Sequence, residues 1–299
     1  MPAASANAIQ IEYESLGDPS APAIVLIMGL GMQSISWPDP FCAALVERGF
    51  RVIRFDNRDV GHSTKMTGAK GTRLGLAFAK AFLGLKVNAP YSLEDMARDT
   101  TGLMDALGIE RAHVVGASLG GMIAQVLAAK FPARVLSLTS IMSTSGNRKV
   151  GRGKPEAMKA LLSRPDDPED MNAVVDHLVG VFGVIGSPGY PQDKAEMRAR
   201  VERSVRRSYY PAGKARQLLA VLASGDRRAL LGHIKAPTLV IHGADDPLVP
   251  VAAGRDTAHH IPGAKLQVIP GMGHDLPPAL FETLATAIAD HCRAAAAGA

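Results

Sequence analysis

A serine in a short glycine-rich turn is the residue of this chain best suited to nucleophilic chemistry. Ser118 lies in Gly116-Ala117-Ser118-Leu119-Gly120, after the apolar stretch 113–115 and before apolar residues at helical spacing from about Met122. A strand that turns directly into a helix brings backbone against backbone, and glycine has no side chain to clash and tolerates strained dihedral angles. The pattern predicts a nucleophile elbow, which exposes a serine hydroxyl at a sheet edge. The alternative is an ordinary strand–turn–helix connection whose serine only caps the helix.

An aspartate and a histidine follow two later predicted strands. A serine hydroxyl is a poor nucleophile at neutral pH, so it needs a base, and the base needs an acid that orients it. Asp246 comes after the strand predicted at 238–241, and His274 comes after the strand predicted at 265–269. In an open parallel sheet such groups belong on loops at the carboxyl ends of the strands. The order Ser…Asp…His predicts a catalytic triad of Ser118, Asp246 and His274.

Strands and helices alternate along the first 146 residues, and strands return after residue 228. Strands are expected at 9–14, 23–28, 51–55, 113–115, 135–142, 238–241 and 265–269, and helices at 41–48, 93–107 and 278–292. This alternation predicts right-handed crossovers and an α/β fold with a mostly parallel central sheet flanked by helices. The segment 147–228 is mostly helical and punctuated by prolines. We expect a core domain of residues 1–146 and 229–299, with residues 147–228 as a helical cap, or lid, over the active-site edge.

These segments resemble the α/β-hydrolase superfamily over nearly the whole chain. In that family the acid commonly lies in a Gly-x-x-Asp-x-x-x-Pro segment, and here Gly243 and Pro250 select Asp246 over its neighbour Asp245. His274 also lies in a family-like segment, Gly-x-Gly-His-Asp-Leu-Pro. The resemblance implies the α/β-hydrolase fold with a helical lid insertion.

Three further segments resemble a narrower branch of the family, which contains lipase-like esterases and aclacinomycin methylesterase. They are Met28-Gly29-Leu30-Gly31, Trp37-Pro38-Asp39 and Arg54-Phe55-Asp56-Asn57-Arg58-Asp59. Many relatives have His-Gly where this chain has Met28-Gly29. The likeness is weaker in the lid, and because the lid shapes the pocket, the substrate does not transfer with the family.

An acyl-transfer enzyme must also stabilise the oxyanion of its tetrahedral intermediate, usually with two backbone N–H donors. One donor is expected from Leu119, directly after the serine. By its position in the family the second is expected from Leu30, and a methionine at position 28 does not remove that backbone donor. Gly29, Met122 and Phe182 are candidates for substrate contacts.

Several other polar residues are expected to be structural. His113 lies within a buried strand and is expected to be packed in the core. His242 begins the acid loop and is expected to shape it, and His62 is expected to be structural although its loop resembles a family loop near the pocket. Asp275 is expected to cap a helix or to support its neighbour His274.

The composition favours a cytoplasmic enzyme with one large core. The chain has 299 residues, 47% of them hydrophobic, and two widely separated cysteines without metal-ligand spacing. Neither a secretory signal nor a stretch long enough to span a bilayer is apparent, so no stable membrane association is expected. The formal charge of +5 comes without an aromatic-interleaved basic motif, which argues against nucleic-acid binding. The oligomeric state stays open between a monomer and a homodimer.

Together these features predict a serine hydrolase that cleaves carboxylic esters of small to medium hydrophobic small molecules through an acyl-enzyme on Ser118. No metal and no organic cofactor is expected. One alternative uses the same triad for C–C bond hydrolysis, lactone opening or perhydrolysis. Another is a ligand receptor that keeps a slow triad. A haloalkane dehalogenase is disfavoured because its nucleophile would be an aspartate.

Overall fold

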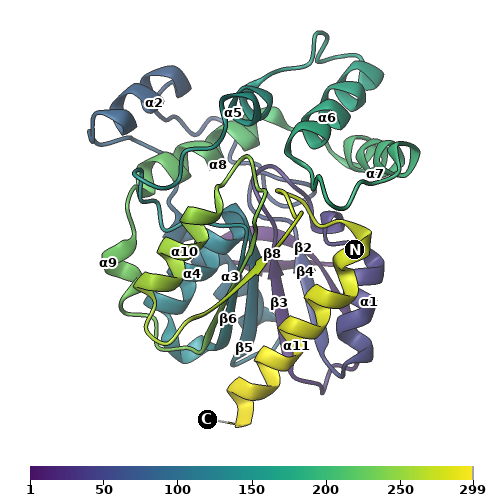
Figure 1. The fold of residues 1–299 in the computed structure, drawn as a ribbon, viewed down its shortest axis with the longest axis vertical. Coiled ribbons are helices and arrows are strands. Elements are labelled where there is room, and N and C mark those ends of the chain that lie inside the picture. The colour runs from purple at the N-terminus through teal and green to yellow at the C-terminus, as the bar shows by residue number, and fades with distance from the viewer. Residues whose placement is uncertain (298–299) are drawn as a thin grey trace.

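The central feature of the fold is a single eight-stranded sheet, described here from a computed structural model of residues 1–297 (Figure 1). The strand order is β1-β2-β4-β3-β5-β6-β7-β8. β1 pairs with β2 and β2 with β4 in antiparallel fashion, and all the other neighbours are parallel. The predicted fold class, a mostly parallel sheet flanked by helices, is therefore confirmed.

The elements follow one another in the alternation expected of an α/β fold. The strands are β1 (Ala3–Ala6), β2 (Ile9–Leu16), β3 (Ala23–Ile27), β4 (Arg51–Phe55), β5 (Ala112–Ala117), β6 (Val135–Ile141), β7 (Thr238–Gly243) and β8 (Lys265–Ile269). The α-helices are α1 (Asp39–Glu47), α2 (Leu74–Phe82), α3 (Leu93–Ala106), α4 (Leu119–Lys130), α5 (Pro155–Leu162), α6 (Met171–Ile185), α7 (Lys194–Arg207), α8 (Pro211–Ser224), α9 (Arg228–Leu231), α10 (Val251–His260) and α11 (Phe281–Ala297). Short 3-10 turns occupy Ser34–Ser36, Pro132–Arg134 and Pro278–Leu280.

Two hydrophobic layers hold the helices against the sheet. On one face, α3 and α4 bury Met96, Leu103 and Ile123 against β-strand residues such as Val25 and Val114. On the other face, the cluster joins α1 and α11 to alternate residues of the same strands, and its members include Trp37, Phe41, Leu45, Leu284 and Ile288. Because successive strand residues point to opposite faces, β3 and β5 contribute to both layers. This sandwich fixes the strand ends that carry the candidate site.

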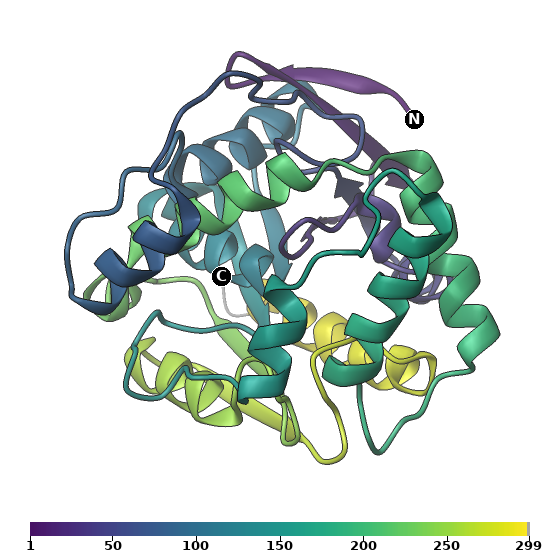
Figure 2. The same ribbon diagram turned by 90° about the horizontal axis from the view of Figure 1, so that it is seen from above.

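Helices α5–α8 lie together above one end of the sheet (Figures 1 and 2). They come from the 147–228 segment that the sequence analysis assigned to a cap. Helix α2 lies beside α8, and its Ala77 packs with Val87 and with Leu219 of α8. No element was expected in this earlier segment.

Several element boundaries differ from those expected, most by one to three residues, and one strand was not foreseen. Helix α4 begins at Leu119 rather than near Met122, so the helix starts directly after the serine. The closing helix α11 continues from Phe281 to Ala297 rather than ending at Cys292. The N-terminal hairpin strand β1 was not foreseen. None of the helices within residues 1–297 combines the length and the apolar character that a bilayer-spanning helix requires.

His113 on β5 is a buried core histidine, in the position the sequence analysis expected. Its side chain is 2% exposed, its Nδ1 lies 2.8 Å from Ser137 Oγ, and its ring meets Phe50 edge-on. Burial lowers the pKa of His113 from 6.5 to about 4, and the nearby His291 adds to this effect. The imidazole is therefore neutral in the folded protein at pH 7.

The lowered pKa of His113 predicts a loss of stability in mild acid. Between pH 6.5 and 4 the unfolded chain binds a proton at this residue that the folded chain does not, so the free energy of unfolding falls as the pH falls. Each unit of pKa difference corresponds to roughly 1.4 kcal/mol. In urea unfolding at pH 7 and pH 4.5, His113→Gln is expected to lose less stability between the two pH values than the wild type. An equal loss in both proteins would contradict the prediction.

Candidate active site

Ser118 lies at a tight turn that the absence of side chains makes possible. It joins β5 directly to α4 with φ 54° and ψ −116°, a backbone conformation unusual for a residue with a side chain. A Cβ at residue 120 would lie 1.9 Å from the carbonyl oxygen of Ile27, and one at residue 116 would lie 2.1 Å from that of Gly120. The expectation that a side chain at position 116 or 120 would clash with the backbone therefore agrees with the structure.

The structure brings Ser118, His274 and Asp246 into one hydrogen-bonded chain. Ser118 Oγ and His274 Nε2 are 3.0 Å apart. His274 Nδ1 and Asp246 Oδ2 are 2.7 Å apart, and because a carboxylate only accepts, Nδ1 carries the proton. Nε2 is then free to accept the proton of the serine hydroxyl. The three residues follow β5, β7 and β8, whose carboxyl ends meet at one edge of the sheet.

The carboxylate of Asp246 is held by the loop in which it lies. Its Oδ1 accepts hydrogen bonds from the amides of Leu248 (2.9 Å) and Val249 (2.8 Å). His242 Nε2 donates to the carbonyl of Val249 at 2.7 Å, and burial lowers the pKa of His242, so this histidine braces the acid loop in its neutral form. The neighbouring Asp245 instead accepts from the amide of Gly271.

The loop that carries His274 is tied to the segment that follows α6. The amide of His274 donates to the carbonyl of Ile185 at 2.8 Å, and the amide of Gly273 donates to Ser187 Oγ at 2.8 Å. Asp275 contacts Ser187 Oγ and accepts from Gln192 Nε2 at 2.5 Å. Burial raises the pKa of Asp275. Asp275 therefore joins the histidine loop to the connection between α6 and α7.

The loop after β3 lies against the serine. A Cβ at Gly29 would lie 3.3 Å from Ser118 Cβ and 3.9 Å from its Oγ. Within the described part of the chain, the backbone amides of Leu30 and Leu119 have no hydrogen-bond acceptor. Leu119 is the first residue of α4, where the amides and the helix dipole favour negative charge. Leu119 directly follows Ser118 in the chain, and Leu30 directly follows Gly29, which lies against the serine side chain.

Side-chain amides hold the loop after β3 in place. Gln217 of α8 is fully buried, and its Oε1 accepts from the amide of Gly31 at 2.8 Å while its Nε2 donates to the carbonyl of Arg58. Asn57 Nδ2 donates to the carbonyl of Met28 at 3.0 Å. Met28 itself packs in the core. These contacts support the loop that carries Met28.

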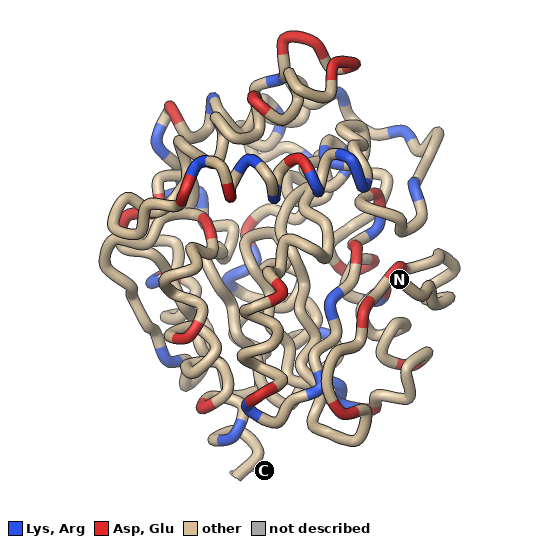
Figure 3. Tube along the Cα trace, turned by 90° about the vertical axis from the view of Figure 1, so that its right-hand side faces the viewer, with Lys and Arg blue, Asp and Glu red and all other residues tan. Residues whose placement is uncertain are grey.

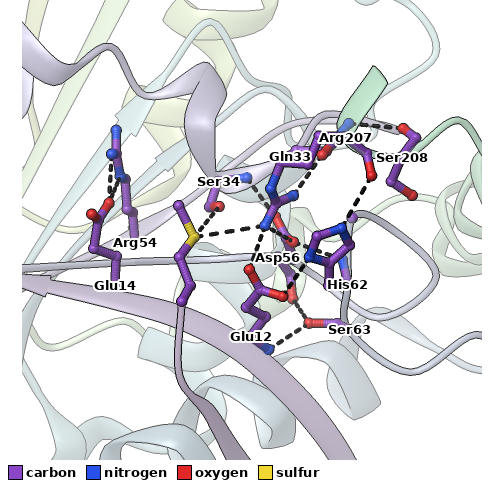
Figure 4. A network of polar contacts seen from close by, with 12 residues as sticks. Glu12, Glu14, Gln33, Ser34, Arg54, Asp56, His62, Ser63, Arg207 and Ser208 are labelled. Carbon is purple, nitrogen blue, oxygen red and sulfur yellow. Dashed lines mark hydrogen bonds and ion pairs between the residues drawn. The ribbon is translucent and has the colours of Figure 1, made fainter. Parts of the chain in front are cut away.

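A network of charged and polar side chains fastens α7 to the sheet (Figure 4). Arg207 binds Glu12 and the fully buried Asp56, each at 2.8 Å, and its Nη1 donates to Gln33 Oε1. Gln33 also donates to the carbonyls of Ser204 and Ser208.

Two further residues, His62 and Arg216, lie next to this network. His62 lies at its exposed rim, with Nδ1 2.8 Å from Glu12, and so has a structural environment. Next to the network, Arg216 of α8 makes two hydrogen bonds to the buried Asp59. Both cap-side helices α7 and α8 are therefore anchored to the loop after β4.

Met122 and Phe182, the remaining candidates for substrate contacts, lie in different environments. Met122 is one turn beyond the serine, with its amide donating to the Ser118 carbonyl. Phe182 of α6 packs with Val181, Ile185 and Leu248, close to the acid loop. Both cysteines are buried, and burial raises their thiol pKa to about 12, so neither is suited to nucleophilic attack. Within residues 1–297, no group of three or more potential metal ligands comes together.

Acidic and basic residues are interspersed over the side of the molecule shown in Figure 3.

The residues that sequence reasoning missed are Gln217, Gln33 and Arg207. Gln217 and Gly31 are 186 positions apart, and Arg207 and Gln33 are 174 apart, so no local pattern marks these contacts. The polar glutamine among the apolar residues of α8 was the only available signal.

Comparisons with known proteins agree with this architecture. Residues 22–277 match the alpha/beta hydrolase fold family. Rhodomycin D methylesterase DnrP of Streptomyces peucetius is 31% identical over 308 residues, covering 94% of each chain. The putative carbamate hydrolase RutD of Variovorax paradoxus is 29% identical, with 88% of this chain and 89% of that protein covered. The crystal structure of the enol-lactonase from Burkholderia xenovorans is 26% identical, with a TM-score of 0.71, and the match covers 98% of this chain and 100% of that one.

These relatives are named as a methylesterase, a carbamate hydrolase and a lactonase, and together they support hydrolase activity for this chain. The resemblance inferred from the sequence motifs is confirmed. The chain belongs to the α/β-hydrolase fold family.

Proposed function

We propose that this protein is a serine hydrolase that cleaves carboxylic esters of small to medium hydrophobic molecules. The observation that carries the proposal is the hydrogen-bonded chain Ser118–His274–Asp246. The named activity of the methylesterase relative supports an ester as the substrate. No metal or organic cofactor enters the proposed reaction.

In the first half-reaction, His274 Nε2 takes the proton of Ser118 as the serine oxygen attacks the ester carbonyl carbon. The carbonyl oxygen gains negative charge and receives hydrogen bonds from the amides of Leu119 and Leu30. Asp246 stabilises the imidazolium through Nδ1. The C–O bond to the alcohol then breaks, the leaving oxygen takes the proton from His274, and an acyl-enzyme remains on Ser118.

In the second half-reaction, His274 takes a proton from water, and the resulting hydroxide oxygen attacks the acyl carbon. The same two amides receive the charge of the second tetrahedral intermediate. Its collapse breaks the bond to Ser118, the serine oxygen recovers a proton from His274, and the carboxylic acid leaves. One water is consumed for each ester, and the enzyme returns to its starting state.

Residues 147–228 act as a cap over this site in our proposal, with Gly29, Met122 and Phe182 in contact with the substrate. The apolar side chains that Phe182 joins on α6 favour a hydrophobic acyl or alcohol group. An internal ester is the second candidate substrate, and it is supported by the lactonase among the structural relatives. Lactone opening would use the same steps, with the alcohol staying attached to the acyl group.

Replacing the serine tests the mechanism directly. In steady-state assays with p-nitrophenyl esters from C2 to C12, Ser118→Ala is expected to lower kcat on the order of a thousandfold or more, because the covalent step is lost. The wild type is expected to be most active on short or medium acyl chains. Unchanged turnover in the variant would mean that Ser118 is structural.

Two adjacent aspartates offer a matched pair for testing the acid. Asp246→Asn is expected to lower kcat about a thousandfold or more, because the amide no longer holds His274 in the tautomer that accepts the serine proton. Asp245→Asn is the control, since Asp245 accepts only from the Gly271 amide. If both variants lose activity equally in the same assay, the assignment of Asp246 is wrong.

The backbone donor of Leu30 cannot be removed by substitution, but its support can be. Gln217→Leu deletes the acceptor of the Gly31 amide and is expected to lower kcat about tenfold to a hundredfold while changing KM much less. The affinity for a boronic acid transition-state analogue should fall in parallel. Gln125→Leu removes another fully buried glutamine side chain and serves as the control. A matched loss in both variants would point to a general effect on folding.

A further inference from the structure

Lys214 of α8 carries a positive charge that no acidic group balances. Its side chain is half-buried, and its Nζ donates to the carbonyl of Leu161 at 3.0 Å. Among the described residues, no carboxylate lies within ion-pair distance of this ammonium group. By contrast Arg207 and Arg216, on the neighbouring turns of α7 and α8, both bind buried aspartates.

The stem of Lys214 lies on the loop that carries the proposed oxyanion donor. A Cβ at Gly31 would lie 3.1–3.4 Å from Cγ, Cβ and Cδ of Lys214. Gly31 follows Leu30 directly, and Gly29 in the same loop contacts Ser118. The lysine therefore starts from the oxyanion side of the proposed site.

The ammonium end of Lys214 contacts α5 at the carbonyl of Leu161. Leu161 of α5 packs in one cluster with Ile185 and Leu248. The carbonyl of Ile185 accepts from the amide of His274, and the amide of Leu248 donates to Asp246. Lys214 thus connects α8, which lies above the oxyanion loop, with α5, which packs with residues bonded to the base and acid loops. Both helices lie over the same end of the sheet (Figure 2).

This arrangement is unfavourable for the protein on its own. Burial of a charge costs free energy unless the charge is paired, and burial lowers the pKa of Lys214. An ammonium group has three N–H donors, and the Leu161 carbonyl uses one of them. Capping the C-terminal end of α5 accounts for that single hydrogen bond, but it leaves the charge without a counter-ion.

We propose that Lys214 binds a carboxylate of the substrate, so that the ester this enzyme cleaves carries one acidic group on an otherwise apolar body. The inference rests on the proposed ester hydrolase activity and narrows its substrate class. A single ammonium group suits a carboxylate, whereas doubly charged phosphate groups are commonly bound by several cationic or amide donors.

The test compares charged and neutral esters of matched length in wild-type and variant enzymes. Monomethyl succinate, glutarate and adipate are paired with their dimethyl esters, and kcat/KM is measured for each. The wild type is expected to prefer the best monomethyl ester about tenfold to a hundredfold, as a hydrogen bond to a charged group allows. In Lys214→Met that ratio is expected to fall to near one, chiefly through KM. Lys214→Arg should keep part of it.

Lys159→Met is the matched control, because it removes an exposed charge from α5 near the same position. The control is expected to keep the wild-type ratio. A wild-type enzyme that shows no preference for the monomethyl esters overturns the proposal. A ratio that survives in Lys214→Met also overturns it, and Lys214 is then a residue that only caps α5.

Equilibrium binding separates this inference from the proposed function. Calorimetry with Ser118→Ala measures the affinity for the monomethyl esters without turnover, and adding Lys214→Met is expected to weaken it at least about tenfold. Loss of binding in the double variant, together with a wild type that hydrolyses no ester, would overturn the esterase and leave the carboxylate site. Equal affinity in the single and double variants would overturn the carboxylate site whatever the turnover.

Discussion

Helix α4 approaches the end of β3 so closely that residue 120 has no room for a side chain, because a Cβ there would lie 1.9 Å from the carbonyl oxygen of Ile27. The arrangement of the site depends on this contact. It brings the start of α4 against the strand that leads into the loop of Gly29 and Leu30. The amides of Leu30 and Leu119, which have no hydrogen-bond acceptor within residues 1–297, come from segments almost ninety positions apart that this contact holds together.

Helices α6 and α8, which lie above the sheet, contact both the loop of the proposed base and the loop of the proposed oxyanion donor. On the base side, the carbonyl of Ile185 at the end of α6 accepts from the amide of His274. On the oxyanion side, Gln217 of α8 accepts from the amide of Gly31. The ion pairs of Arg207 and Arg216 with buried aspartates hold α7 and α8 against the loop after β4. The helices above the sheet therefore take part in positioning the loops and do not merely cover them.

The sequence predicted the features that local chemistry determines. The fold class followed from the alternation of apolar strands with helices, and the elbow followed from glycines at 116 and 120. The order of Ser118, Asp246 and His274 relative to their strands was enough to propose that they meet. The contacts of Gln217 and Arg207 were not predictable, because each joins residues more than 150 positions apart through a single side chain. Helix α2 was missed for a related reason, since its buried Ala77 packs against the distant Leu219 of α8.

The replacement of a family histidine by Met28 has a consequence for how the loop after β3 responds to its surroundings. The side chains that hold this loop from below and above, Asn57 and Gln217, are carboxamides. A carboxamide neither gains nor loses a proton across the range in which a histidine changes its charge. These two supports therefore keep the same hydrogen bonds in acidic and in alkaline medium. A histidine in the place of either carboxamide would change its charge within this range.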